Sequence, residues 1–316
     1  MNTGQRNRII MGSALLLLLI AASFIFGATI FIIALAALAT AWVVEFLSSL
    51  LRKEKFDWTS WYITPLIITL MTTPTIINQL WIIVVATAFG IFFAKSLFGG
   101  QDKNIFNPAT VGLIFIALSF PVFVNTFLDP VTLIAGSQTP AINFKLTPDV
   151  VVSSLTHWQL LLGQYPGAIG TTFKLGILVL GVILMILKVS DWKIPVLYLG
   201  TYFVLSLVFF LSSGRNMDSF NFATYSVLMG HLLFASMFIA TDQQTAPLYS
   251  KGRIIYAVAL GLITFLIQNV TFINKLAANT EGTIFAITFM NAVVGLIDVW
   301  TVPKVKVVPE LQEVTE

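Results

Sequence analysis

One carboxylate in this sequence stands at the end of a long apolar run. Asp242 follows Thr241 where a run of about twenty mostly apolar residues ends. An ionisable group at membrane depth is costly and is therefore a functional candidate. A carboxylate beside threonine hydroxyls suits a hard cation such as sodium, which takes oxygen ligands. We predict that Asp242 contacts an ion or a cofactor. The alternative is an interfacial ion pair with Lys251 or Arg253.

A second polar group opens another apolar run. Asn104 and the pair Asn107-Pro108 precede that run, shortly after Gly99 and Gly100. Asparagine caps a helix by accepting backbone N–H bonds, and proline fits the first helical turn. Helix N-termini also favour anions such as phosphate. The functional interpretation is a polar, closely packed turn at a cofactor or ion site, and the alternative is a plain helix cap.

The other ionisable groups are weaker candidates. Glu45 lies near Arg52 and Lys53, so we expect an interfacial ion pair there. His231 lies within an apolar run, and an ordinary pKa of about 6.5 would permit proton traffic, although a neutral histidine bonded between helices is the favoured interpretation. The chain has no cysteine, which excludes thiolate-held iron–sulfur clusters and cysteine-ligated zinc.

The composition indicates a membrane protein. Charged residues make up only 10% of the 316 residues and the mean hydropathy is +0.92, whereas a soluble domain carries about 25% charged residues. Apolar runs of about 18 or more residues are typical of membrane spans. We expect an all-α multi-pass fold with ten transmembrane helices at 9–26, 28–49, 59–73, 77–97, 107–127, 171–187, 194–212, 222–240, 254–272 and 283–300.

The distribution of basic residues predicts the orientation. With ten spans and a cytoplasmic N-terminus, only four of the 17 lysines and arginines fall outside, namely Lys145, Lys174, Arg215 and Lys275. The remaining thirteen fall on the cytoplasmic side, as the positive-inside rule requires. We therefore expect an inner-membrane protein with both termini in the cytoplasm. The basic residues form no patch, so nucleic acid is not an expected partner.

Two of the expected spans suggest an internal repeat. The third contains Pro65 and runs into 72–75 (Thr-Thr-Pro-Thr), and the eighth ends in the polar segment 240–247. Proline-marked helix ends at matching places in two halves indicate an inverted repeat. We expect a single membrane domain with halves at 1–127 and 171–300. An outer loop at 128–170 joins them, and a cytoplasmic tail follows at 301–316.

Four sequence blocks resemble the RnfD/NqrB family of Rnf and Nqr membrane subunits. Residues 98–112 read FGGQDKNIFNPATVG, residues 240–256 read ATDQQTAPLYSKGRIIY, residues 161–172 read LLGQYPGAIGTT, and Glu281-Gly282, Asn291 and 296–298 follow in the expected order. The resemblance runs over nearly the whole chain. It implies a ten-helix inverted-repeat fold related in architecture to urea channels.

The resemblance also implies flavin cofactors. In the family, FMN is joined through its phosphate to a threonine on the outer side, and Thr139 occupies that place in 136–140 (Gly-Ser-Gln-Thr-Pro). The residues before Thr139 depart from the family pattern, so covalent attachment and its absence both stay open. Riboflavin is a second flavin that the resemblance implies. The residues expected to bind cofactors are Thr139, Asn104, Asn107, Pro108, Gly167, Thr241 and Asp242, with Asp242 also on a sodium path.

The resemblance implies a membrane component of an electron-transport complex. Such a component passes electrons through flavin and couples them to sodium or proton movement. Partner subunits are required, because this chain has no NADH-binding fingerprint and no cluster ligands. It would thus be part of a translocase rather than a complete enzyme. Two alternatives are a flavin-free transporter of urea-channel-like architecture and a stand-alone membrane flavin anchor.

Overall fold

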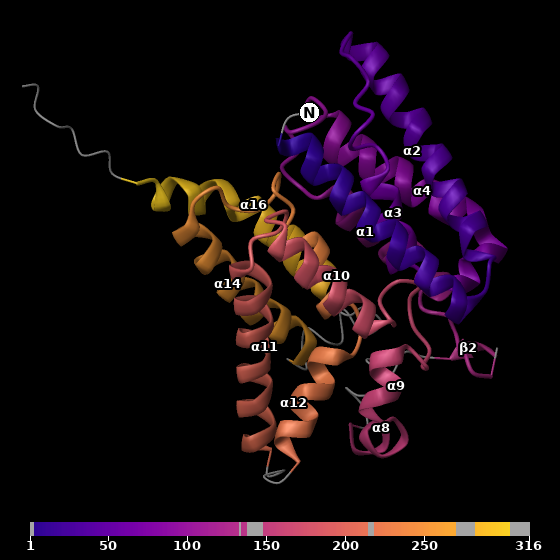
Figure 1. The fold of residues 1–316 in the computed structure, drawn as a ribbon, viewed down its shortest axis with the longest axis vertical. Helices are drawn as coiled ribbons and strands as arrows, with labels where there is room; N and C mark the ends of the chain where they lie inside the picture. Colours follow the sequence, from indigo (N-terminus) through magenta and orange to yellow (C-terminus); the bar gives the residue numbers. More distant parts are fainter. Residues whose placement is uncertain (1–2, 133, 138–147, 214–217, 270–281, 304–316) are drawn as a thin grey trace, which may run out of the picture.

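The fold was analysed in a computed structural model, which describes residues 3–132, 134–137, 148–213, 218–269 and 282–303. Thr139 lies outside these residues. The described chain is mostly helical (Figure 1), which confirms the expected helical class.

The helices of the first 127 residues follow the expected apolar runs closely. They are α1 (Thr3–Phe26), α2 (Ile30–Arg52), α3 (Ile63–Met71), the 3₁₀ turn η1 (Pro74–Gln79), α4 (Leu80–Ile91), the π-helical turn η2 (Phe92–Ser96), α5 (Pro108–Ser119) and α6 (Pro121–Val124).

The connecting segment between the halves contains short elements. A two-stranded antiparallel hairpin pairs β1 (Phe127–Leu128) with β2 (Ala135–Ser137). Two short helices follow, α8 (Pro148–Ser154) and α9 (His157–Leu162). The later helices are α10 (Lys174–Ile186), α11 (Lys193–Ser212), α12 (Ser219–Leu228), α13 (Leu232–Phe234), the π-helical turn η3 (Ala235–Ile239), α14 (Ser250–Asn269) and α16 (Thr283–Thr301).

In the part of the chain that the structure describes, six helical segments are long and apolar enough to cross a bilayer. They are 3–26, 30–52, 74–96, 193–212, 250–269 and 283–301, and the helices 219–228 and 232–239 form a seventh candidate bent by 65°. The helices α3, α5 and α10 are shorter, at 9, 12 and 13 residues. Each of the ten expected runs contains a helix among the described residues. Ten crossings nevertheless stay a prediction, because those three helices are shorter than about 20 residues.

Two spans that we expected to be continuous, 107–127 and 222–240, are interrupted in the structure. The span expected at 107–127 is wrong in length, because Phe120 leaves the helical conformation (φ −132°, ψ 49°) immediately before Pro121. The eighth span bends at Met229 and Gly230, where Met229 is extended and Gly230 has φ 66°. Its interruption therefore lies well before the polar segment 240–247.

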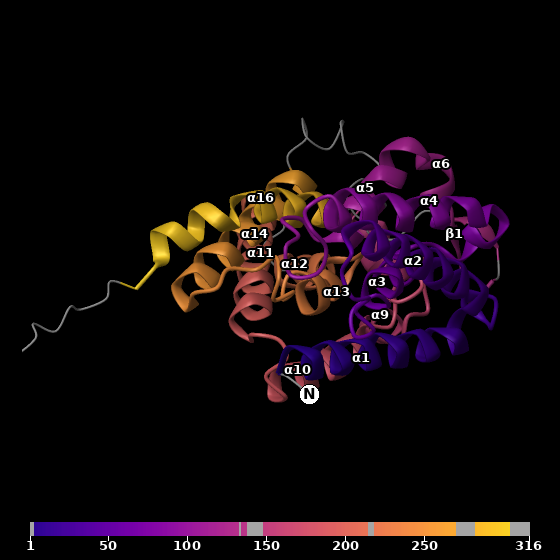
Figure 2. The same cartoon turned by 90° about the horizontal axis from the view of Figure 1, so that it is seen from above.

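The helices pack in two groups (Figures 1 and 2). In the first group α1 contacts α3, α2 contacts α3 and α4, and α4 contacts α5. In the second group α10 contacts α13 and η3, α11 contacts α12 and α14, and α14 contacts α16. The groups meet where α5 packs on α16 and where α1 packs on α10.

Residues of the segment 169–174 donate hydrogen bonds to the end of α3 and to the bend at Gly230. The carbonyls of Leu70 and Thr72 accept hydrogen bonds from the backbone N–H groups of Gly170 (2.7 Å) and Ile169 (2.9 Å). Lys174 is fully buried, and its Nζ donates to the carbonyl of Gly230 at 2.5 Å. Both interruptions thus have their freed backbone groups hydrogen-bonded inside the protein, as a low-dielectric surrounding requires.

The helices α4 and α5 approach each other closely at two glycines. A methyl group on Gly90 would lie 2.2 Å from the carbonyl oxygen of Pro108, and one on Gly112 would lie 2.3 Å from that of Ala86. Both obstacles are backbone atoms, which cannot rotate away. The two glycines therefore set the distance between the helices, as small residues do in membrane proteins.

Substitution of Gly112 by alanine is expected to destabilise the protein by about 1–3 kcal/mol, because α5 must move away from α4. Gly200→Ala in α11 is the matched control, since nothing lies within 4 Å of its added methyl group. Thermal unfolding of the purified protein in detergent would compare the two. Equal melting temperatures for both variants would show that the α4–α5 contact is not tightly packed.

Candidate functional site

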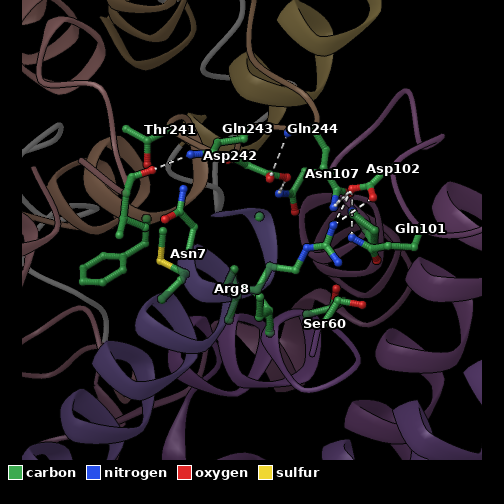
Figure 3. A pocket seen from close by; sticks show the side chains of 18 of the residues that line it. Asn7, Arg8, Ser60, Gln101, Asp102, Asn107, Thr241, Asp242, Gln243 and Gln244 are labelled. Atoms are coloured by element: carbon green, nitrogen blue, oxygen red, sulfur yellow. Dashed lines mark hydrogen bonds and ion pairs between the residues drawn. The ribbon is translucent and has the colours of Figure 1, made fainter. Parts of the chain in front are cut away.

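A cavity of about 390 Å³ lies between the two helix groups. Figure 3 shows its wall, to which α1, η2, the turn before α5 and the segment after η3 contribute. The polar and charged side chains in the wall are those of Asn7, Arg8, Ser60, Thr64, Lys95, Gln101, Asp102, Asn107, Thr241, Asp242, Gln243 and Gln244. Segments distant in sequence therefore form one mixed polar and apolar chamber.

Asn107 links the start of α5 to Asp242. Its Oδ1 accepts from the backbone N–H groups of Ala109 (3.0 Å) and Thr110 (3.4 Å), and its Nδ2 donates to Oδ2 of Asp242 at 3.1 Å. The predicted cap is confirmed. The side chain caps the helix and also orients the carboxylate of Asp242. A helix cap and a polar site residue are therefore not exclusive interpretations of Asn107.

Asp242 has hydrogen bonds but no cationic partner among the described residues. Besides Asn107, the donors are the Gln244 backbone N–H (3.2 Å) and the Thr245 hydroxyl (3.3 Å). Arg253, the expected alternative partner, instead binds Asp191 at 2.6 Å. Asp242 lies beyond Ile239, the last helical residue of its segment, and burial raises the pKa of its carboxyl above the ordinary value. The carboxylate is therefore available for a proton or a metal cation.

Arg8 joins the start of α1 to two loops at the rim. Its guanidinium binds Asp57 at 2.7 Å and Asp102 at 2.8 Å, and Nε2 of Gln244 also donates to Asp102 at 2.9 Å. Burial alone would raise the pKa of Asp57. Hydrogen bonds from Thr59 and the charge of Arg8 outweigh that effect, so the pKa of Asp57 lies below its usual value.

A buried ion pair stands in the same wall. Nζ of Lys95 lies 2.8 and 2.9 Å from the two carboxylate oxygens of Glu45 and 3.4 Å from the Ser60 hydroxyl. The expected pairing of Glu45 with Arg52 or Lys53 is therefore wrong, because the side chain turns inward to Lys95. Lys95 belongs to the π-helical turn η2, and such turns are frequent at functional sites.

Asn291 connects the cavity to α16. Its Oδ1 accepts from the backbone N–H of Asn107 (3.1 Å), and its Nδ2 donates to the carbonyl of Thr245 (3.1 Å). One turn away, the hydroxyls of Thr110 and Thr288 bond at 2.7 Å. These contacts fix the Asn107–Asp242 pair at the junction of the two helix groups.

The structure brings only some of the predicted site residues together. Asn107, Pro108, Thr241 and Asp242 all line the cavity. The Thr241 hydroxyl, however, donates to the Met237 carbonyl within its own segment, so Thr245 rather than Thr241 supports the carboxylate.

Two predicted residues, Asn104 and Gly167, are not in the cavity wall. Asn104 is buried next to the cavity lining but bonds to the Phe106 carbonyl, and its Oδ1 has no partner among the described residues. Gly167 lies in the segment that bonds the far end of α3, where a Cβ would approach the Thr172 side chain to 2.5 Å. Thr139 lies outside the described residues.

Sequence reasoning missed Arg8, Asp57 and Asp102 as residues of the cavity and its rim. Their pairs span 49 and 94 residues, so no local spacing could reveal them. The only sequence feature that could have identified them is their position. Each lies near an end of an expected span, on the face of the membrane where the expected topology also puts Asp242. No group of three or more His, Cys, Asp or Glu side chains in the described part of the chain could hold a metal ion.

These helices and this cavity define a multi-pass α-helical membrane protein with a polar chamber between two helix groups. The sequence profile of the NQR2, RnfD, RnfE family matches residues 2–306. The chain belongs to that family.

Individual relatives agree with this assignment. The chain is 28% identical over 286 residues to the B subunit of the Na(+)-translocating NADH-quinone reductase of Chromohalobacter salexigens, covering 88% of this chain and 66% of the relative. It is 26% identical over 330 residues to the D subunit of the ion-translocating oxidoreductase complex of Haemophilus influenzae, covering 90% and 89%. The corresponding D subunit from Halorhodospira halophila is 29% identical over 256 residues, covering 71% and 69%.

Proposed function

We propose that this chain is a membrane component of an ion-translocating electron-transport complex that holds a flavin in the cavity and a cation at Asp242. The observation that carries the proposal is the hydrogen bond, in the wall of that cavity, between Asn107 and the carboxylate of Asp242, to which no lysine or arginine of the described residues binds. The names of the relatives, which describe ion-translocating oxidoreductases, support the same function.

The cavity fits the ring system of a flavin in size and chemistry. Its volume of about 390 Å³ lies within the range of about 300–1,000 Å³ found for ligand pockets. Met11, Ile63, Ile67 and Phe238 supply apolar wall for a flat ring, and amide side chains supply donors and acceptors for its edge. A bound flavin would supply one- and two-electron redox chemistry. The chain's own residues would fix its orientation.

Asp242 supplies the coupling charge. Two neighbouring carboxylates, Glu45 and Asp102, are neutralised by Lys95 and Arg8, whereas Asp242 is held by neutral donors alone in the described structure. A sodium ion or proton at this carboxylate would neutralise it. Negative charge arriving in the same cavity favours that cation, because the low-dielectric wall strengthens the attraction.

The packing supports an inverted repeat. The contacts of α3 with α1, α2 and α5, and those of α4 with α2 and α5, recur among α10, α11, α12–η3, α14 and α16 in the same order. The first turn of α3 lines the cavity that holds Asp242, whereas the interrupted end of α3 lies at the opposite end of that helix. This arrangement and the positive-inside rule support the proposal of ten crossings, with the N-terminal face in the cytoplasm of an inner membrane.

Flavin release separates this function from its alternatives. We expect this chain, taken from the assembled complex and then denatured, to release one flavin into solution, because the proposed contacts in the cavity are non-covalent. Met11→Trp would place an indole in the cavity and reduce the released flavin. An assembled complex in which this chain holds no flavin would refute the proposal and favour a flavin-free transporter. A chain that holds flavin, but whose electron transfer does not depend on sodium ions or protons, would favour a stand-alone flavin anchor.

Covalent FMN at Thr139 is a separate prediction that rests on the family resemblance. Thr139→Val is expected to abolish the ultraviolet fluorescence of the denatured chain in a gel, since a phosphoester requires the hydroxyl. The flavin released from the cavity should be unchanged in this variant, which controls for assembly. A fluorescent band that survives the substitution would move the attachment site away from Thr139.

A further inference from the structure

A second cavity, of about 330 Å³, lies beside the first on the face that carries the N-terminus. It is formed by the end of α10, the connection to α11, the segment after η3 and the start of α14. Thr241, Gln243 and Val189 line both cavities. This second cavity has no part in the function proposed above.

The second cavity is rich in positive charge. Lys188, Lys193 and Arg253 line it, together with the single carboxylate of Asp191. That carboxylate is already engaged, because one oxygen binds Arg253 at 2.6 Å and the other accepts from the backbone N–H of Lys193 at 3.0 Å. The cationic side chains therefore exceed what the cavity itself neutralises.

Neither Lys188 nor Lys193 forms an ion pair with a carboxylate among the described residues. Nζ of Lys193 donates to the hydroxyl of Ser250, which is neutral. Lys188 is exposed and follows α10 in the left-handed conformation (φ 58°), which turns the chain toward α11. Ser190, in the same wall, is buried and its hydroxyl has no partner among the described residues. The cavity thus offers two cations and an unsatisfied hydroxyl to an anion.

The surroundings place this cavity at the level of lipid headgroups. It lies between the end of the apolar helix α10 and the start of α11, one of the six candidate spans. Ile186 is 72% exposed on one side of the connection and Trp192 is 58% exposed on the other. Exposed tryptophan is typical of the membrane–water interface, and basic pockets between transmembrane helices bind phosphate-bearing headgroups.

We propose that this second cavity binds the phosphate of an anionic glycerophospholipid, with Lys188 and Lys193 as the principal contacts and Arg253 behind them. The acyl chains lie along the exposed apolar surface of α10 and α11. Because Gln243 donates to the carbonyl of Val189 at 2.9 Å between the two cavities, the bound lipid also steadies the segment that carries Asp242.

Native mass spectrometry of the purified full chain tests this site. The probes are phosphatidylglycerol, phosphatidylcholine and soluble glycerol phosphate, each titrated separately. We expect one phosphatidylglycerol to be retained in preference to phosphatidylcholine. Each of Lys188→Ala and Lys193→Ala should weaken it about five-fold, since a basic residue near a membrane surface contributes about 1 kcal/mol.

The control is the exposed pair Lys53 and Lys55, which follows the end of α2 and lies outside the second cavity. The double variant Lys53→Ala/Lys55→Ala should retain the lipid as the unmodified chain does. The proposal is overturned by equal retention of both phospholipids or by an equal loss in the control variant. Binding of glycerol phosphate as tight as that of phosphatidylglycerol would also overturn it, because the site would then recognise free phosphate.

Discussion

Replacing Asp242 by asparagine is expected to abolish cation-coupled turnover while raising the stability of the protein. Its carboxylate is surrounded by neutral donors, namely Asn107, Thr245 and the Gln244 backbone N–H, with no cationic partner among the described residues. Removing an inadequately compensated charge from such a site stabilises the fold by about 1–3 kcal/mol. The same change removes the ligand that a sodium ion or proton needs. Thermal unfolding and ion-coupled activity of the reconstituted complex would measure both effects.

The stability difference depends on pH in a defined direction. Burial raises the pKa of Asp242 above its ordinary value of 3.8, so the folded protein binds the proton more readily than the unfolded chain. Ionisation therefore weakens the native protein as pH rises through the raised pKa. We expect the advantage of Asp242→Asn to be largest at neutral pH and to disappear as pH falls toward 3.8.

Asp102→Asn is the matched control for this substitution. Asp102 also lines the cavity, but it is exposed and binds Arg8 at 2.8 Å. Its neutralisation removes a favourable pair, so it should not stabilise the protein. If Asp242→Asn lowered stability and left coupling intact, Asp242 would be a structural residue, and the proposed cation site would be wrong.

Replacing Lys95 by methionine is expected to cost about 3–5 kcal/mol, the largest loss of stability among the single changes considered. The substitution strands the carboxylate of Glu45, which is buried with its partner (side chains 9% and 7% exposed). A buried pair contributes little net stability when intact, but removing one member leaves an uncompensated charge. Thermal unfolding in detergent would measure the loss.

The double variant Lys95→Met/Glu45→Leu distinguishes this explanation from lost packing. It removes both charges and should recover most of the stability. If the double variant lost as much stability as Lys95→Met alone, the loss would come from altered packing and not from the unpaired charge of Glu45. The more exposed Arg52–Glu54 pair is the control, and its removal should leave the melting temperature unchanged.

The sequence was informative where a physical constraint is local. Each expected apolar run contains a helix, and the pair Asn107-Pro108 identified the start of α5, because hydrophobic length and helix capping depend on neighbouring residues. The short helices α8 and α9, within the expected loop 128–170, were not predicted. The breaks were located less well. Gly230 was not identified as a bend, since its left-handed conformation depends on packing against α10 and on the hydrogen bond from Lys174.

The ion-pair partners of the charged residues could not be predicted from neighbouring positions in the sequence. Glu45 lies close to Arg52 in sequence but pairs with Lys95, 50 residues away. Arg8 similarly reaches Asp102 across 94 residues. Such pairs depend on which helices meet, and apolar periodicity in a lipid-exposed helix carries little information on that choice. The candidate cation residue Asp242 was nevertheless identified, because its position at the end of an apolar run is unusual in itself.

The buried Lys174 has a consequence for biogenesis. Its ammonium group lies at the first residue of α10 and donates to the carbonyl of Gly230, 56 residues later in the chain. When the ribosome has delivered α10 to the membrane, that acceptor has not yet been synthesised. The hydrogen bond between the two segments therefore forms only after the later one arrives. Docking of α10 against the bend at Gly230 is therefore a late step in the assembly of this helix group.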